Sequence, residues 1–269
     1  MTESMDRRIL GAFVCVDPIT GNSVVNPLTV TVPQWAVKPN RSGVYVIFDG
    51  PNFNSLTSQF IPSGTWPAPT SFEVTLCDPG RRYLPRRANV GAPLSVPAIA
   101  PPPAGSTSNA AAQAALTRSG TVFDPQQVSV YRAPSAPTGP NWAVIRASVT
   151  RAGTTPPQGL PWAVLQVVRT SDNTVLATGQ SDTNGEALLA VAGLTIETNT
   201  TGTGPVTLST VAVSVNVYFD PGILTEPAGW IPNPDDILSK LPDTAFSSAN
   251  QAVQLGSGQV LLMNFVLSV

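Results

Sequence analysis

The strongest pattern in this sequence is an alternation of apolar and polar side chains with a period of two. In the second half, large apolar side chains occupy every second position at Val211, Val213, Val215, Val217 and Phe219. Successive side chains of a strand point to opposite faces of a sheet. This spacing therefore predicts a strand with one buried face. Along the chain, apolar residues recur with this period of two more clearly than with the 3.6-residue period of a helix.

Similar alternation occurs elsewhere, at 28–32, at 72–77 and at the end of the chain, where one face carries Leu261, Met263, Phe265, Leu267 and Val269. We expect further short strands, each bounded by Gly, Pro, Asn or Asp, at about 9–16, 43–48, 141–150, 162–169, 174–180 and 186–191. Many short, regularly punctuated strands predict an all-β fold of sandwich or barrel type.

The 269 residues are enough for two ordinary domains. Between the two groups of strands, residues 95–120 combine several prolines with an Ala-rich piece, which favours an extended spacer. We therefore expect an N-terminal β-sandwich module at 1–95, a Pro/Ala-rich linker at 96–124 and a C-terminal β-sandwich module at 125–269. The second module should contain a Pro-rich insertion at about 220–250, with a short helix that begins at Pro234.

Charge is scarce in this chain. Charged residues make up 11% of it, and the net charge is -2. Such a surface is typical of proteins that become buried in an assembly, although Thr, Ser, Asn and Gln can replace charge as the solvated surface. Without a basic field, no nucleic-acid partner is expected. Residues 1–16 do not resemble a signal peptide, and no apolar stretch is long enough for a membrane helix, so we expect a soluble protein that is made in the cytoplasm.

The chain contains no histidine, which excludes most catalytic templates. A Ser-His-Asp or Cys-His site, a histidine general base and a His-ligated zinc all require it. Cys15 and Cys77 cannot complete a zinc site alone, and without an export signal we expect two reduced thiols in or near a sheet. Glycine motifs that bind phosphate are also missing. We expect no enzymatic activity, no cofactor and no metal.

Paired carboxylates could still support glycosidase chemistry. The candidates by residue type are Asp17, Asp49, Glu73, Asp172, Asp182 and Glu186. Nearly all lie beside Gly, Pro or Asn, which favours a role in capping turns. Residues 182–186 partly match a calcium loop but lack its third alternating oxygen ligand and its distal Glu, so a hairpin turn is the preferred interpretation.

A weak internal repeat links the two halves. The first half reads VDPITGNSV at 16–24 and PNRSGVYV at 39–46, and the second reads VRTSDNTVL at 168–176 and SDTNGEAL at 181–188. In each half a polar turn joins two strands, and a second turn ending in glycine opens another. We expect Gly43 and Gly185 to supply the positive φ that such turns require.

These segments resemble the carboxypeptidase-regulatory-like, transthyretin-like family, whose members show a strand, an Asp-x-x-Gly turn and a later Thr-Asp-x-x-Gly-x-Tyr hairpin. Residues 181–185 follow the hairpin pattern, whereas the first half has Asn40 in place of the Asp. The resemblance implies rigid spacer or docking modules of transthyretin-like or Ig-like sandwich fold, without catalytic residues.

A second resemblance rests on RRYLPRR at 81–87, VYRAPSAP at 130–137 and NWAVIR at 141–146. Together these segments are similar to uncharacterised proteins associated with phage-tail-like contractile injection systems. The resemblance implies a particle component or assembly factor. Its partners would be protein subunits of a larger assembly, or further copies of this chain.

The basic segment offers candidate docking residues, which are Arg81, Arg82, Tyr83, Arg86 and Arg87. Arginine forks pair well with carboxylates across interfaces, and Tyr and Arg are frequent in interface hot spots. The alternative is a charged edge strand that prevents aggregation between sheet edges.

The tryptophans suggest a rival function. Trp35, Trp66 and Trp230 could form platforms for a glycan, although packing is the default role of such residues. Trp142 and Trp162 begin strands and are expected to close the ends of the second core. The sequence thus predicts a non-enzymatic structural or adaptor component that docks within a large assembly. A carbohydrate-binding or adhesive module of a fibre or surface appendage is the alternative.

Overall fold

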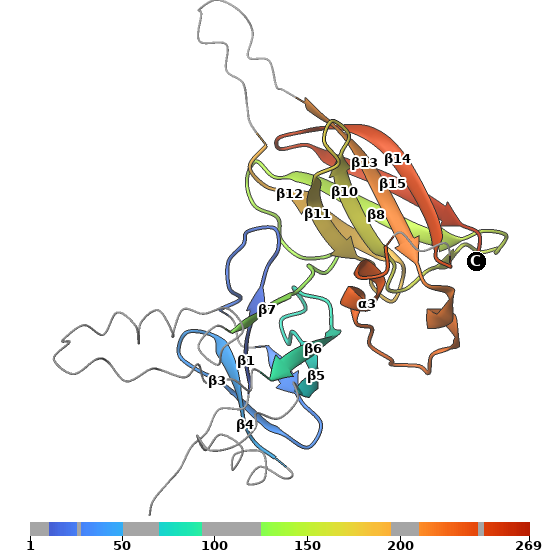
Figure 1. The fold of residues 1–269 in the computed structure, drawn as a ribbon. Helices are drawn as coiled ribbons and strands as arrows, with labels where there is room; N and C mark the ends of the chain where they lie inside the picture. Colours follow the sequence, from blue (N-terminus) through green and yellow to red (C-terminus); the bar gives the residue numbers. More distant parts are fainter. Residues whose placement is uncertain (1–10, 26–27, 51–69, 93–124, 195–209, 242–244) are drawn as a thin grey trace, which may run out of the picture. The chain divides into compact units, whose positions relative to one another are not determined.

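A computed structural model of the protein describes residues 11–25, 28–50, 70–92, 125–194, 210–241 and 245–269 (Figure 1). The described residues form short β-strands, one 3-10 helix and one short α-helix. The predicted all-β, sandwich-like class is therefore confirmed. The chain divides into two compact units, and each is described separately below.

The first unit contains two small sheets. In one, the strand order is β3-β4-β1-β7, and in the other it is β2-β5-β6. The strands are β1 (Gly11–Val16), β2 (Thr29–Thr31), β3 (Ala36–Pro39), β4 (Val44–Asp49), β5 (Thr70–Cys77), β6 (Arg86–Ala92) and β7 (Gln126–Ser129). β1 pairs antiparallel with β4 and parallel with β7. Its side chains are buried almost throughout, which is why it reads as a continuous apolar run.

The core of the first unit is built on aromatic side chains. Phe13 and Tyr45 stack with their ring centroids 5.2 Å apart. The Tyr45 hydroxyl accepts a hydrogen bond from the Leu28 amide at 2.8 Å, so the phenol is buried with a partner. Burial is also the main cause that raises the pKa of Tyr45. This bond ties the segment before β2 to β4.

The unit boundaries differ from a division at a central linker. The first unit draws on Met1–Val16, Ser23–Leu76 and Arg87–Ser129, and the second on Asp17–Asn22, Cys77–Arg86 and Val130–Val269. β7 belongs to the first unit because it pairs with β1. The sequence analysis expected each unit to be one continuous stretch of the chain. In the structure each unit combines segments that are distant in the sequence, because such segments pair with one another. The predicted linker at 96–124 lies outside the described residues.

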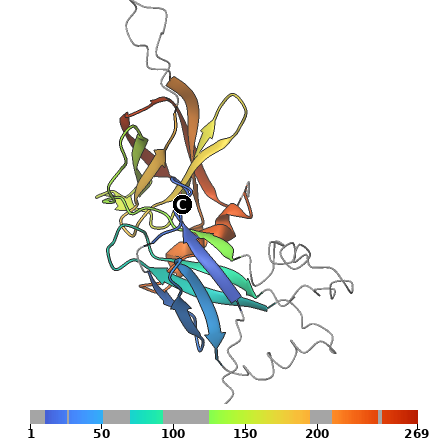
Figure 2. The ribbon, with the colours of Figure 1, turned by 90° about the vertical axis from the view of Figure 1, so that its left-hand side faces the viewer.

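The second unit is a β-sandwich (Figures 1 and 2). One sheet has the order β11-β10-β13-β14, and the other has the order β12-β8-β15, with β9 paired to β8. The strands are β8 (Ala143–Arg151), β9 (Gln158–Gly159), β10 (Val164–Arg169), β11 (Val175–Gln180), β12 (Glu186–Val191), β13 (Thr210–Phe219), β14 (Ser247–Gly256) and β15 (Val260–Leu267). All described pairs are antiparallel except β8 with β15, which run parallel.

The alternating patterns place the core of this sandwich as predicted. On β13, Val213, Val215, Val217 and Phe219 are each at most 1% exposed. On β15, the buried residues are the alternate ones beginning with Met263. Each such side chain contributes about 1.5–3 kcal/mol by leaving water, so these two strands anchor the unit.

The segment predicted as an insertion at about 220–250 lies between β13 and β14, which begins at Ser247. It contains the 3-10 helix η1 (Pro221–Thr225) and the helix α3 (Pro234–Leu238), which confirms the expected helix start at Pro234. Ile223 and Ile237 from these turns join the core cluster. β14 escaped prediction because it is an edge strand whose side chains are mostly small or polar.

The internal repeat is visible in two turns of the same geometry. Asn40 Oδ1 accepts the amides of Ser42 and Val44, both at 2.9 Å. Asp182 Oδ1 accepts the amides of Asn184 and Glu186 at 2.7 and 3.0 Å, which are the same two positions along the chain. Asn therefore replaces Asp without loss of the acceptor.

The glycines that end both turns have positive φ, as predicted: Gly43 has φ 76 and Gly185 has φ 82. Cys15 lies in β1 and Cys77 at the end of β5, and neither takes part in a disulfide. In the described ranges, no helix is long and apolar enough to cross a bilayer.

Candidate functional site

The basic segment 81–87 does not form one exposed docking surface. Arg86 is only 1% exposed, and its guanidinium lies 2.5 Å from Asp235 Oδ2 and 3.2 Å from Asn233 Oδ1. It also lies 5.8 Å from the centre of the Tyr131 ring. The structure thus corrects the prediction for Arg86, which is buried as a link between the 77–86 segment and the start of α3. Sequence shows the charge of such a residue but not the distant carboxylate that holds it.

The other arginines of the segment have different surroundings. Arg82 is half-buried and lies 3.6 Å from Asp78 Oδ2. The exposed Arg81 has φ 53, a value that places it in the tight turn after Asp78. Arg87 belongs to the first unit, where it lies 3.3 Å from Glu73 Oε2.

Tyr83 belongs to a buried polar cluster in the second unit, centred on Asp17. Asp17 is 3% exposed, and its Oδ2 accepts Arg132 Nη2 at 2.6 Å, Arg132 Nε at 2.9 Å and the Tyr83 hydroxyl at 3.1 Å. Its Oδ1 accepts the Ile19 amide at 2.9 Å. Burial, followed by the negative charge of Asp17, raises the pKa of Tyr83. With both oxygens engaged, Asp17 acts as a structural acceptor.

The Arg132 guanidinium also stacks 4.8 Å from the Trp142 ring centroid. Trp142 and Ile19 pack on a small core cluster of Ala136, Val144, Leu188 and Ala190, on the outer side of the β12-β8-β15 sheet. The cluster around Asp17 therefore fastens residues 17–22 and 130–137 onto that sheet.

Among the described residues, the remaining candidate carboxylates have separate surroundings. Asp172 and Asp182 cap turns, as predicted, and the hydrogen bond from the Thr174 amide is the main cause that lowers the pKa of Asp172. Glu73 faces Arg87, and Glu186 is exposed on β12. The side chain of Asp49 lies outside the described residues. Among the described residues, no group of three or more Cys, Asp or Glu could hold a metal ion.

The three tryptophans proposed as platforms have different surroundings. Trp66 lies outside the described residues. Trp35 packs edge-on against Phe72 with centroids 5.0 Å apart, and a Cβ added at Gly50 would overlap its ring. This packing gives Trp35 a structural role. Trp230 is half-buried and lines a cavity of the second unit.

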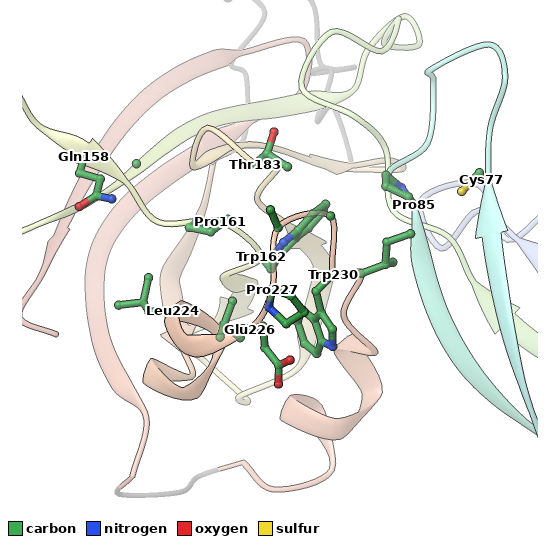
Figure 3. A pocket seen from close by; sticks show the side chains of 15 residues that line it. Cys77, Pro85, Gln158, Pro161, Trp162, Thr183, Leu224, Glu226, Pro227 and Trp230 are labelled. Atoms are coloured by element: carbon green, nitrogen blue, oxygen red, sulfur yellow. The ribbon is translucent and has the colours of Figure 1, made fainter.

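This cavity, the Trp162–Trp230 pocket, has a volume of about 570 Å³ (Figure 3). Pockets of roughly 300–1,000 Å³ are typical of small-molecule sites. Aromatic, proline and aliphatic side chains form most of its wall, with a few polar groups among them. The side chains that matter below are Trp162, Trp230, Pro161, Pro227, Gln158, Thr183 and Glu226.

Two glycines bring the polar part of this wall together. A Cβ at Gly159 would overlap the Asn184 carbonyl oxygen, and a Cβ at Gly185 would overlap the Val149 carbonyl oxygen. Only glycine therefore permits the backbone of β9 to approach the turn before β12 so closely. As a result Gln158 and Thr183, from segments far apart in the sequence, line the same pocket.

Trp162 is held rigidly at the pocket wall. It is 6% exposed, belongs to the core cluster as predicted, and has φ 66. Such a conformation is rare for a bulky side chain and persists only where the surroundings enforce it. Ser181 enforces it here, because its Oγ accepts the Ala163 amide at 2.8 Å and donates to the Leu160 carbonyl at 2.9 Å. No pattern in the sequence indicates that Trp162 and Trp230 line the same cavity.

A second surface feature lies on β15. Val260, Leu262 and Val266 are 60%, 80% and 63% exposed, on the face opposite the buried Met263 and Phe265. We call these three residues the β15 row. β15 ends its sheet. The backbone carbonyls of Asn264, in β15, and of Ser268, just after it, accept side-chain hydrogen bonds from Gln251 and Ser247 of β14. A partner would therefore contact the apolar side chains of the β15 row, rather than pair with its backbone as an added strand.

No family model and no curated protein matches this chain. Among solved structures, it is similar to a streptococcal ancillary pilin, with 10% identity, a TM-score of 0.24, and coverage of 87% of this chain and 50% of that chain. It is also similar to the Bacillus anthracis TIE protein, with 9% identity, a TM-score of 0.24, and coverage of 100% and 41%. The chain thus spans half or less of these two proteins. At such TM-scores the function has to be argued from the residues themselves.

Proposed function

We propose that this chain is a non-enzymatic structural adaptor, which docks onto a protein subunit of a larger assembly through the β15 row. The observation that carries the proposal is the exposure of Val260, Leu262 and Val266 on one face of one strand. An aligned group of exposed aliphatic side chains marks an interaction surface more often than isolated ones do. Burial of each against a partner would contribute about 1.5–3 kcal/mol before the costs of association.

The surroundings of the row support a protein partner. β15 reads VLLMNFVL and carries no charged residue, whereas exposed edge strands usually carry charge or proline that blocks association. Arg146, which is exposed, stands opposite Leu262 in the register with β8. An apolar centre beside an arginine is the usual composition of a protein interface. The low overall charge of 11% fits a surface that becomes covered.

For the assembly itself, we propose a phage-tail-like contractile injection particle. This part of the proposal is supported by the sequence resemblance of residues 81–87, 130–137 and 141–146, and not by the fold. It is separable from the docking role, because the β15 row would serve any protein subunit with a complementary apolar surface.

The test is sedimentation of particles from cells that produce the protein, with Leu262→Lys compared with the wild type. The wild type is expected to travel with a megadalton particle, and Leu262→Lys is expected to remain in the light fraction because it places a charge in the contact. Val175→Lys is the matched control, since Val175 is 47% exposed on β11 in the other sheet. Equal sedimentation of Leu262→Lys and the wild type would refute the docking role.

The composition of the heavy fraction tests the finer proposal. Sheath and tube proteins identified there by mass spectrometry would support the contractile particle. A heavy fraction of another composition would remove that assignment and leave the adaptor role in place.

A further inference from the structure

We infer that the Trp162–Trp230 pocket is a binding site for a neutral carbohydrate. This inference does not depend on the proposed docking role, because none of the residues that line the pocket belongs to the β15 row. It rests on the aromatic wall, on polar side chains without a partner among the described residues, and on the charge of the lining.

The aromatic wall suits the apolar faces of a sugar ring. A pyranose presents patches of C–H groups that pack on the face of an indole, while its hydroxyl groups lie around the ring edge. Trp230 is half-buried and offers the accessible ring, whereas Trp162 is 6% exposed and adds a small, rigid part of the wall behind it. In Figure 3 these two side chains occupy the middle of the view, with Pro227 and Glu226 next to Trp230 and Gln158 farther to the side.

The polar side chains of the pocket are available to a ligand. Glu226, Gln158 and Thr183 are all exposed. In the part of the chain that the structure describes, their side chains make no hydrogen bond or ion pair. A carboxylate accepts hydrogen bonds only, whereas the amide and the hydroxyl can also donate. Vicinal hydroxyl groups of a sugar can satisfy all three, because each hydroxyl both donates and accepts.

The charge of the lining narrows the ligand class. None of the described residues that line this pocket is Lys or Arg, and Glu226 contributes a negative charge. Phosphates and acidic sugars would meet repulsion without a compensating cation. The lining therefore selects against anionic ligands.

Two other ligand classes fit less well. A proline-rich peptide packs on Trp and Pro walls, but its prolines lack backbone N–H groups and offer nothing to Glu226. A quaternary ammonium requires the exposed faces of several rings around one point. Trp162 is only 6% exposed, so it cannot present a full face in that manner. A neutral sugar needs only one accessible ring, that of Trp230, together with the hydrogen-bonding groups.

The test is titration of the full chain with a panel of neutral mono- and oligosaccharides, followed by tryptophan fluorescence and by saturation-transfer NMR. At least one panel member should bind saturably. Trp230→Ala should weaken that binding by about tenfold or more, which corresponds to the loss of about 1.4 kcal/mol. Glu226→Gln, at an exposed position where folding is not at risk, should weaken it by several-fold. Glu186→Gln is the matched control, because Glu186 is exposed but does not line the pocket.

Each contrary result is decisive. Absence of saturable binding across the panel, or unchanged affinity in both Trp230→Ala and Glu226→Gln, would overturn the inference. Tighter binding of choline or of a proline-rich peptide than of every saccharide would overturn it in favour of that ligand class. Leu262→Lys should bind the saccharide as the wild type does, so the pocket and the β15 row succeed or fail separately.

Discussion

Removing the charge of Asp17 should destabilise the second unit strongly. In Asp17→Asn the side chain keeps its shape, but Arg132 loses the carboxylate that it contacts at 2.6 and 2.9 Å. The side chains of Arg132 and Asp17 are 15% and 4% exposed, so solvent replaces the lost partner poorly. Breaking a buried pair from one side costs about 3–5 kcal/mol. We expect about 3 kcal/mol here, since Arg132 keeps its contact with Trp142.

The free energy of unfolding would be measured by urea denaturation of the full chain, with circular dichroism and tryptophan fluorescence as probes. Hydrogen exchange of the Val144 and Leu188 amides would assign the loss to the second unit. A double-mutant cycle with Arg132→Met isolates the interaction energy between Asp17 and Arg132. The double variant should be about 2 kcal/mol more stable than the sum of the two single losses predicts. A loss below about 1 kcal/mol in Asp17→Asn, or a coupling energy near zero, would refute the reasoning.

Two further perturbations test buried polar groups. Gln180 is fully buried on β11, and among the described residues neither its Oε1 nor its Nε2 has a hydrogen-bond partner. Gln180→Met should therefore raise the free energy of unfolding by about 1–3 kcal/mol in the same urea assay. A loss of stability would instead show that the amide is satisfied. Burial raises the pKa of Tyr131 to about 12. Above pH 10 the unfolded chain therefore releases a proton that the native state keeps. Stability should fall by about 1.4 kcal/mol per pH unit between pH 10 and 12. Between pH 10 and 12 this slope should be shallower in Tyr131→Phe than in the wild type, whereas below pH 9 the two proteins should show equal slopes. An unchanged slope in the variant above pH 10 would show that Tyr131 is not the group responsible.

Strands were predictable from the sequence where their own residues show the alternating pattern. On β13 and β15, large apolar residues occupy every second position on the buried face, and both strands were predicted within a residue or two. β14 carries mainly Ser, Asn, Gln and Ala because it lies at a sheet edge, so its pattern is weak. β7 is short, and only its pairing with β1 identifies it.

The sites were harder to predict because they depend on distant residues. Arg86 was interpreted as a surface residue, since nothing near it in the sequence indicates that Asp235 pairs with it. Trp162 and Trp230 come from different segments, and the pocket between them depends on the backbone approach at Gly159 and Gly185. The turns at Asn40 and Asp182 were predictable because each acceptor and its amides lie within four residues.

The interleaving of the two units limits how the protein can be dissected. Asp17 and Arg132 are 115 residues apart, and Arg86 and Asp235 are 149 residues apart, so each pair closes a long loop. Long loops form slowly, because their closure costs entropy before the contact is made. A fragment that begins at the expected boundary, residue 125, would leave Arg132 and Asp235 without their partners. Cutting at the proline-rich segment would therefore keep every strand of the C-terminal sandwich but remove two ion pairs that hold earlier segments to it.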